Sequence, residues 1–464
     1  MIHSFISACV YAAKKLHNFC QNSFQRTEPD VPQLHRFSAW GNKPTVAHLI
    51  SEGVDINKTH CYQDDNDYVT AMAVATNPQI IEMLMDAGGI DSHDLKLIGH
   101  SLGLQGSIFL KGKENSYGIN YEGMSEERAF PIVAHHIGLF EKKILEESTG
   151  TAFNGAEKKA LNIISQAFDQ FVRHRDDKFF NPSLSYHQGK ALIIRCVWPG
   201  HTGFTLLYKD KLYIANKGGN TLIPSISCYQ IDAGYLKSLS VVDFSSLIES
   251  IGKKRKNIFS SNLSLKGFKK LNPRLLYYKR LSRQKNKNCS YSNVKRGFEV
   301  ILTALLDDSA LTWENKIDKE KMYEAFTMFD RLSSIDEYTE KYKLSPNPQV
   351  WEPLLTYLRD KSGLSERTKF IAAYIIHKLK GSAINLSDDE IIHRMNKIQS
   401  CRNYMWKFYT LAGRFEDLLF ENKNRIENIK KIVCHVPFIW RRQRAKALSV
   451  GFLEKVNVKP PRYN

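Results

Sequence analysis

Helical periodicity dominates the first part of the chain. After a Gly41-Asn42 turn, the apolar residues Val46, Leu49 and Ile50 fall on one face, and a shorter apolar segment from residue 32 precedes the turn. Apolar residues spaced three and four apart predict amphipathic helices. Residues 32–57 are therefore expected to form two short helices that fold back on each other and end in a Gly-x-Asp-x-Asn turn at 53–57.

A second, weaker copy of this pattern follows. Its apolar positions are Ala71, Met72, Ile80, Ile81, Leu84 and Met85, and it ends at Gly88-Gly89. From Leu34 to Met72 the offset is 38 residues, and from Gly53 to Gly88 it is 35. Two such units cannot bury their apolar faces alone, so a helix expected at 5–20, or the chain after them, must cap the stack. At 130–145 a degenerate third copy competes with an ordinary helix pair.

Further along the chain the period changes from helical to strand-like. Residues 191–197, 204–208 and 211–215 are short β-rich runs, and Lys209-Asp210 joins the last two as a hairpin. Beyond Phe298 the pattern is helical again, including 322–332, 370–379 and 404–419. The sequence thus predicts an α+β protein with a helical repeat array at 1–95, a mixed α/β middle at 96–310 and a helical C-terminal region at 311–464.

Composition excludes several classes of protein. No apolar run approaches the roughly 18 residues that span a bilayer, and residues 5–13 fit a packed first helix better than a signal peptide. The eight cysteines form no CxxC pair, which argues against a disulfide framework or a zinc ribbon and favours a reducing compartment. His135-His136 lacks a second ligand pair at metal spacing. We expect no metal and no cofactor.

The net charge of +18 has one main source. Residues 253–296 hold 15 Lys or Arg and no Asp or Glu, whereas the rest of the chain holds 51 against 48. Within this basic segment, Lys253, Lys254, Arg255 and Lys256 match a monopartite nuclear import signal, with a solvated loop as the alternative. Interleaved aromatic residues allow contact with nucleic acid, at Phe259, Phe268, Tyr277, Tyr278 and Tyr291. No RNA-binding signature accompanies them, so direct nucleic-acid binding is the less favoured interpretation.

Two residues at the ends of the predicted hairpin suggest chemistry. His201 stands where the first strand begins, and Asn216 stands where the second strand ends. On adjacent antiparallel strands, an Asn amide oxygen can accept a hydrogen bond from one imidazole nitrogen and fix the tautomer of the ring. This pair would form the base and its orienting group.

A candidate nucleophile lies at the start of a predicted helix. Asn288 is a suitable N-cap, so Cys289 would occupy the first turn, where the helix N-terminus and the cations Lys285 and Lys287 favour thiolate. Gln284, five residues upstream, could donate a side-chain amide hydrogen to an oxyanion. The alternative for each residue is a purely structural role.

These motifs resemble known families. With Leu34-His35 at the Leu-His position, the helix pairs closely resemble ankyrin repeats, whose period is about 33 residues. The order His, Asn, Gln, Cys resembles the papain-like cysteine peptidases of the deubiquitinase and acetyltransferase-effector clan. Together the two resemble the ankyrin-bearing effectors that Legionella delivers through its type IV secretion system.

The resemblance implies a virulence effector that binds a host protein through its ankyrin repeats and acts in the host cytosol or nucleus. It makes His201 the general base, Asn216 its orienting residue, Cys289 the nucleophile and Gln284 the oxyanion donor. Two departures from the pattern of these peptidases leave open a pseudoenzyme. The third group, Asn216, is an amide and not a carboxylate, and Lys and Asn precede Cys289 where a Gly would give a substrate easier access. The rival is a non-enzymatic nuclear adaptor for a host protein or a ribonucleoprotein.

Overall fold

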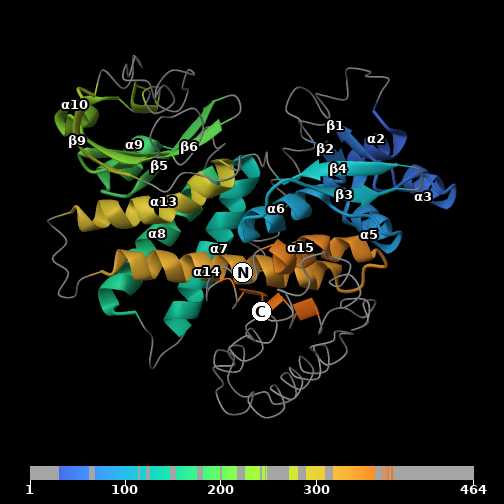
Figure 1. Cartoon of the computed structure of the whole chain (residues 1–464). Helices are drawn as coiled ribbons and strands as arrows, with labels where there is room; N and C mark the ends of the chain where they lie inside the picture. Colours follow the sequence, from blue (N-terminus) through green and yellow to red (C-terminus); the bar gives the residue numbers. More distant parts are fainter. Residues whose placement is uncertain are drawn as a thin grey trace, which may run out of the picture. The chain divides into compact units, whose positions relative to one another are not determined.

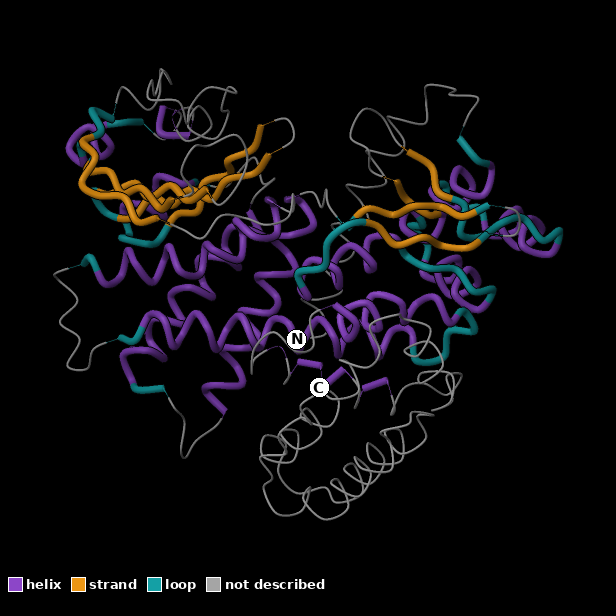
Figure 2. The backbone as a smooth tube through the Cα atoms, viewed as in Figure 1, coloured by secondary structure: helices purple, strands orange, loops and turns teal. Residues whose placement is uncertain are grey.

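Two compact units make up the described part of the chain. The computed structural model describes residues 31–61, 68–112, 115–121, 126–146, 153–174, 181–198, 201–216, 225–240, 243–245, 247, 271–280, 289–308 and 317–360, with helical positions at 368, 371–372, 374–375 and 378–379. Unit 1 includes residues 122–330, and unit 2 includes 31–61, 68–121 and the chain after Asp330. Figure 2 distinguishes their helices from their strands.

Unit 1 is built on a five-stranded antiparallel sheet. Its strands are β5 (Leu192–Trp198), β6 (His201–Tyr208), β7 (Lys211–Asn216), β8 (Ser225–Gln230) and β9 (Arg274–Arg280), paired in chain order. The predicted hairpin is confirmed, with Phe204 opposite Ala215 and Tyr208 opposite Lys211. Lys209 opens the two-residue turn with a φ of 53°, a left-handed conformation that two-residue hairpin turns require.

Helices cover both faces of this sheet. They are α8 (Gly155–His174), α9 (Pro182–His187), α10 (Ala233–Ser238) and α13 (Cys289–Leu306), together with α7 (Glu126–Glu146), whose Phe130 reaches the sheet. The first part of α14 (Lys319–Tyr342) packs against α13 and α7. Figure 1 shows α13 lying along the sheet, with α7 and α8 beside it. The predicted helix beginning at Cys289 is confirmed.

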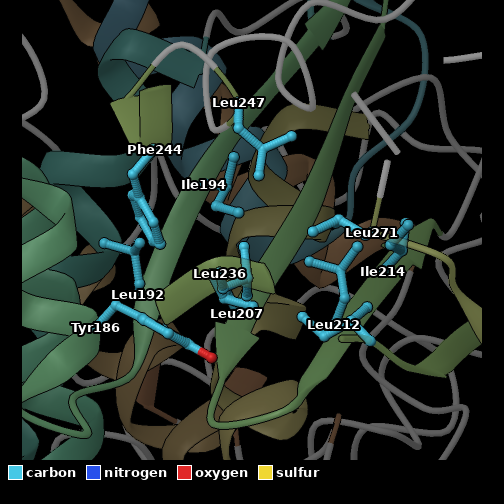
Figure 3. Close-up of a cluster of buried hydrophobic side chains, with 11 residues drawn as sticks. Tyr186, Leu192, Ile194, Leu207, Leu212, Ile214, Leu236, Phe244, Leu247 and Leu271 are labelled. Carbon is cyan, nitrogen blue, oxygen red and sulfur yellow. The ribbon is translucent and has the colours of Figure 1, made fainter. Parts of the chain in front are cut away.

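One face of the sheet carries an aliphatic core. Leu207, Leu212 and Ile214 are buried against α10 and the segments around 244–247 and 271 (Figure 3). The whole cluster is Tyr186, Leu192, Ile194, Leu207, Leu212, Ile214, Ile231, Leu236, Phe244, Leu247 and Leu271. Because alternate strand residues point to opposite faces, the residues between them must form a second core.

Aromatic rings form that second core. Phe204 is fully buried, and its ring centroid lies 6.3 Å from that of Phe130 on α7 and 5.9 Å from that of Phe168 on α8. Gly297 lets α13 approach closely, since a Cβ at this position would lie 2.2 Å from the Phe204 ring. Any larger residue at 297 would push α13 away from the sheet.

Unit 2 contains the predicted helix pairs. The first pair is α2 (Gln33–Ala39) and α3 (Lys43–Ser51), and the second is α4 (Ala71–Val74) and α5 (Pro78–Asp86). They share one core, formed by Leu34, Val46, Leu49, Ala71, Met72, Ile80 and Leu84. Both helix pairs are therefore confirmed as elements, while their assignment to the ankyrin family stays a prediction.

The remaining elements of unit 2 lie between the helix pairs, follow them, or come from the far end of the sequence. They are the hairpins β1 (Thr59–Cys61) with β2 (Tyr68–Thr70) and β3 (Ser107–Lys111) with β4 (Ser116–Asn120), the helix α6 (Ser92–Leu102), the rest of α14, a 3-10 helix at Pro348–Trp351 and α15 (Glu352–Asp360). Tyr342 of α14 donates to Asp94 of α6 at 2.8 Å. Residues far apart in sequence thus share this unit.

Several expectations change. The coarse α+β class is confirmed, but the possible third repeat at 130–145 is wrong, because α7 is one continuous helix of 21 residues there. The apolar face of α7 packs against α8 and α13, and residues 130–145 are not divided between two helices. Strands β1, β2, β3, β4, β8 and β9 were not predicted. The division into 1–95, 96–310 and 311–464 stays a prediction.

Asn57 connects the two helix pairs. Its buried side chain accepts from the Ile90 backbone at 2.9 Å and donates to the Gly88 carbonyl at 3.0 Å. The Gly-x-Asp-x-Asn turn therefore ties the end of the first pair to the end of the second.

We expect Asn57→Ala to lower the free energy of unfolding by about 1–3 kcal/mol, the cost of leaving a buried amide without its partner. Urea unfolding of the full chain measures this loss. Gln79→Ala is the matched control, because Gln79 is exposed and its bond to Lys43 lies at the surface. Equal unfolding midpoints for the two variants would contradict a bridging role for Asn57.

Candidate functional site

The structure describes the backbone of three of the four predicted catalytic residues. His201 is the first residue of β6, Asn216 is the last of β7, and Cys289 is the first of α13. Their side chains, together with all of Gln284 and the predicted import signal at 253–256, lie outside the described residues. The assignment of catalytic roles therefore stays a prediction, whereas the elements that carry three of these residues have defined positions in unit 1.

The direction of α13 along the sheet is set by contacts near its middle and its end. Gly297 meets Phe204 in the middle of β6. At its C-terminal end, Asp308 accepts from Tyr208 at 3.0 Å and from Lys209 at 2.5 Å. The helix therefore runs in the same direction as β6, toward the β6–β7 hairpin.

The shared direction of α13 and β6 also places their first residues. Cys289 lies eight residues before Gly297, which is about 12 Å along the helix at about 1.5 Å per residue. His201 lies three residues before Phe204, which is about 10 Å along the strand at about 3.3 Å per residue. The start of α13 and the start of β6 thus lie toward the same end of the sheet, where β7 also terminates.

A buried carboxylate fixes α13 in this position. Asp330 of α14 accepts from His136 Nδ1 of α7 at 2.8 Å and from the Tyr291 hydroxyl of α13 at 2.8 Å. Its other oxygen is paired with Lys295, also on α13. Tyr291 and Lys295 belong to the first two turns after Cys289, so this cluster holds the beginning of the helix.

The electrostatics of this cluster are those of a buried ion pair. Asp330 and His136 are fully buried, and Lys295 is 8% exposed. Burial by itself would raise the pKa of Asp330, but the charge of Lys295 and the hydrogen bond from His136 outweigh it and hold that pKa well below its usual range. The carboxylate is therefore ionised at all ordinary pH values.

A second polar cluster anchors the other end of α13. Asp307 accepts from the hydroxyls of Tyr213 at 3.2 Å and Tyr277 at 2.5 Å, and its backbone carbonyl accepts from Lys211 at 2.9 Å. Cys228 is buried on the same face, and burial raises the pKa of its thiol. Cys228 is thus a core thiol.

Part of the basic segment is used inside the fold. Lys295 is neutralised by Asp330, Tyr291 is 2% exposed, and Tyr277 donates to Asp307. The interpretation that these two tyrosines stack on nucleic-acid bases is therefore not supported, because a base would have to displace packed or hydrogen-bonded rings. Phe259 and Phe268 lie outside the described residues, as does the side chain of Tyr278.

Three further features of the sequence can be compared with the described residues. Within the described ranges, no group of three or more His, Cys, Asp or Glu residues has the arrangement of a metal site. No helix in that part of the chain has the length and apolar character needed to cross a bilayer. His35, at the Leu-His position, is buried and donates to the Val69 carbonyl at 3.0 Å; burial lowers its pKa to about 4.

The Asp330 cluster was missed from the sequence, although a signal was present. Met322, Phe326 and Asp330 are spaced four residues apart, so the aspartate falls on the apolar stripe of its helix. His136 falls similarly on the buried face of α7, between Val133 and Phe140. An ionisable residue on an apolar stripe predicts a buried partner, but the sequence does not say which one.

Comparison with known proteins gives one structural likeness. No protein-family model matches the sequence, and no curated protein matches it significantly. A solved structure titled "Structure of Legionella Effector AnkH" is similar over 87% of this chain and 90% of that chain, with 17% sequence identity and a TM-score of 0.43. A likeness at this level assigns no function to this chain.

We expect Asp330→Asn to lower the free energy of unfolding by about 3–5 kcal/mol at neutral pH, because Lys295 is left buried without its counter-charge. The native pKa of Asp330 lies below the unfolded value of about 3.9, so its contribution is present above that pH and is lost as pH falls further. The difference in the free energy of unfolding between the variant and the native protein should therefore become smaller in acid.

Chemical unfolding at a series of pH values measures this gap. Asp169→Asn is the control, because Asp169 is an exposed partner of Arg173 on α8 and such pairs contribute about 0–1 kcal/mol. A gap that stays constant from neutral pH to strong acid would contradict the role of the Asp330 charge.

Proposed function

We propose that this chain is a secreted effector in which the helix pairs of unit 2 bind a host protein and unit 1 is a papain-like thiol hydrolase. The main support for a hydrolase is that α13 runs in the same direction as β6, so that both elements start toward one end of the sheet. Cys289, at the start of α13, and His201, at the start of β6, can act together only if the two starts lie at the same end of the sheet.

The proposed chemistry is acyl transfer through a covalent thioester. The Cys289 thiolate, formed when His201 takes the thiol proton, attacks a substrate carbonyl carbon. The resulting oxyanion accepts from Gln284, and His201 then returns the proton to the leaving amine as the acyl bond to nitrogen breaks. Water hydrolyses the thioester and restores the thiol, while Asn216 keeps the imidazole in the correct tautomer.

The features of unit 1 suit this chemistry. The Asp330 cluster fixes the first turns of α13 through Tyr291 and Lys295, and a nucleophile on a rigid helix is held more precisely than one on a loop. The partial positive charge of the helix N-terminus favours thiolate. No step requires a metal or a redox cofactor.

The features of unit 2 suit protein binding. Its helix pairs share a core, and Trp40, at the turn between α2 and α3, is 47% exposed with Arg36 over its ring at 6.0 Å. Exposed Trp and Arg side chains are frequent anchors at protein interfaces. This surface is the proposed docking site for the host protein.

We expect Cys289 to react with iodoacetamide at neutral pH faster than the other cysteines, and His201→Ala to slow that reaction about tenfold or more, because the imidazolium favours thiolate. Peptide mass spectrometry of the native full chain measures each cysteine separately. Cys228, buried and with a raised pKa, serves as the unreactive internal reference.

The matched control is His187→Ala, since His187 is exposed at the end of α9. Labelling of Cys289 that is the same in the native protein and in His201→Ala would overturn the hydrolase. Selective labelling without hydrolysis of any peptide or isopeptide would instead indicate a pseudoenzyme that keeps its dyad.

A nuclear adaptor is the second candidate function. It is favoured by one observation, the run Lys253, Lys254, Arg255 and Lys256 within a segment of 44 residues that has no Asp or Glu. In this alternative the chain would bind a host protein or a ribonucleoprotein complex in the nucleus without turnover.

We expect replacement of these four residues by Ala to move a fluorescent fusion of the full chain from nucleus to cytosol, because import receptors read clustered positive charge. Quantitative imaging gives the ratio of the two signals. Replacing Arg441, Arg442, Arg444 and Lys446 removes the same charge elsewhere and controls for charge alone. An unchanged nuclear signal in the first variant would contradict the import function.

A further inference from the structure

Strand β9 forms one border of the five-stranded sheet of unit 1. The strand order is β5-β6-β7-β8-β9, so β8 is hydrogen-bonded to one side of β9, and no other strand among the described residues pairs with its opposite side. Every residue of a strand other than Pro carries one backbone donor and one acceptor. The outer side of β9, called here its free edge, therefore presents a row of backbone groups that a further strand can bond.

Apolar side chains are exposed beside this free edge. Leu275 is 50% exposed and Leu276 is 39% exposed. A register shift between β8 and β9 leaves Leu276 without an opposite residue, and such a bulge re-aims a side chain. Leu306 of α13, 40% exposed, directly precedes Asp307, to which Tyr277 donates. An open strand edge with exposed apolar side chains is the kind of surface on which another chain adds as a strand.

The charged side chains of β9 are all cations. The strand carries Arg274, Lys279 and Arg280, and no Asp or Glu. Arg274 is exposed and forms no ion pair with any described residue. Lys279 contacts Glu299 of α13 at 3.3 Å and keeps 44% of its side chain exposed. Because the nearest side chains to an added strand are those directly opposite on β9, acidic residues suit that strand.

The same features disfavour two other occupants. Antiparallel pairing of two β9 strands from two copies of this chain would bring the cations of one strand beside those of the other, and like charges at opposite positions are destabilising. A nucleic acid has no peptide groups with which to continue the sheet. The Tyr277 hydroxyl is also already bonded to Asp307, which opposes stacking on a base. An extended acidic peptide uses both the backbone groups and the charges.

We propose that the free edge of β9 binds an extended segment of a partner protein as an added strand. Its acidic side chains would lie near Arg274 and Lys279, and its apolar side chains between them. These two cations are about 17 Å apart along β9 at about 3.3 Å per residue, so the acidic residues of the partner are about five positions apart. Main-chain hydrogen bonds supply affinity and side chains supply specificity in this mode of recognition. The site is independent of the proposed hydrolase and of the proposed docking site on unit 2.

Amide hydrogen exchange of the full native chain tests this site without any mutation. The probe is a pool of nonapeptides with Glu at the second and seventh positions and Val, Leu, Thr or Tyr elsewhere, at about 1 mM in total. Exchange in the fragment that contains β9 should slow about twofold or more, because half-occupancy by an added strand supplies acceptors to the outer amides half of the time. Strand β7, paired on both sides, is the internal reference and should be unchanged.

Two matched pools separate the backbone from the charge. A pool N-methylated at all its inner residues has lost its backbone donors and should give no protection. A pool with Lys in place of Glu should protect β9 less. Arg274→Glu should weaken binding of the Glu pool about fivefold and strengthen binding of the Lys pool. Arg173→Glu makes the same change of charge on α8, where Arg173 is exposed, and should alter neither.

Three results would overturn the proposal. The first is exchange in β9 that the Glu pool leaves unchanged. The second is equal protection by the Glu pool and by either matched pool, since this indicates contact that depends on no added strand or on no acidic residue. The third is protection that appears without peptide as the protein concentration is raised, or that a single-stranded RNA reproduces, since a second copy or a nucleic acid would then be the occupant.

Discussion

The carboxylate of Asp330 is the point on which unit 1 depends. It lies without solvent contact among three helices, accepts from His136 and Tyr291, and is paired with Lys295. A buried charge of this kind is tolerated only when each oxygen is satisfied. Because its partners come from α7 and α13, only one arrangement of these helices with α14 avoids leaving a charge unpaired, and that arrangement sets the position of α13 on the sheet.

Most of the chemistry suggested for this protein is arranged along α13. Its first residue is the proposed nucleophile Cys289, its middle carries the ion pair between Arg296 and Glu299, and its end is held by Asp307 and Asp308. Gly297 brings this helix against the aromatic core of the sheet. A helix fixed at its start, middle and end is a rigid support for side chains that must keep their positions.

The basic segment has a different meaning in the folded protein than in the sequence. As a run of charge it suggests a solvated loop, an import signal or a nucleic-acid contact. In the structure, Lys295 neutralises a buried carboxylate, and Lys279 and Arg296 share Glu299. Asp330 stands 35 residues after Lys295, so a count of charges along a window cannot detect that pair, whereas Glu299 lies three residues after Arg296, just beyond the end of the segment.

Local periodicity was sufficient to identify the two helix pairs, the β6–β7 hairpin and the helix that begins at Cys289, because each depends on residues close together in the chain. It also suggested His201, Asn216 and Cys289 as a set, by spacing and resemblance alone. It missed the β1–β2 and β3–β4 hairpins and the strands β8 and β9, and it left open a third repeat where α7 is one continuous helix. The partners of Asp330 and the direction of α13 were decided only by tertiary packing, because each depends on groups that are tens to hundreds of residues apart and meet only when the helices close on the sheet.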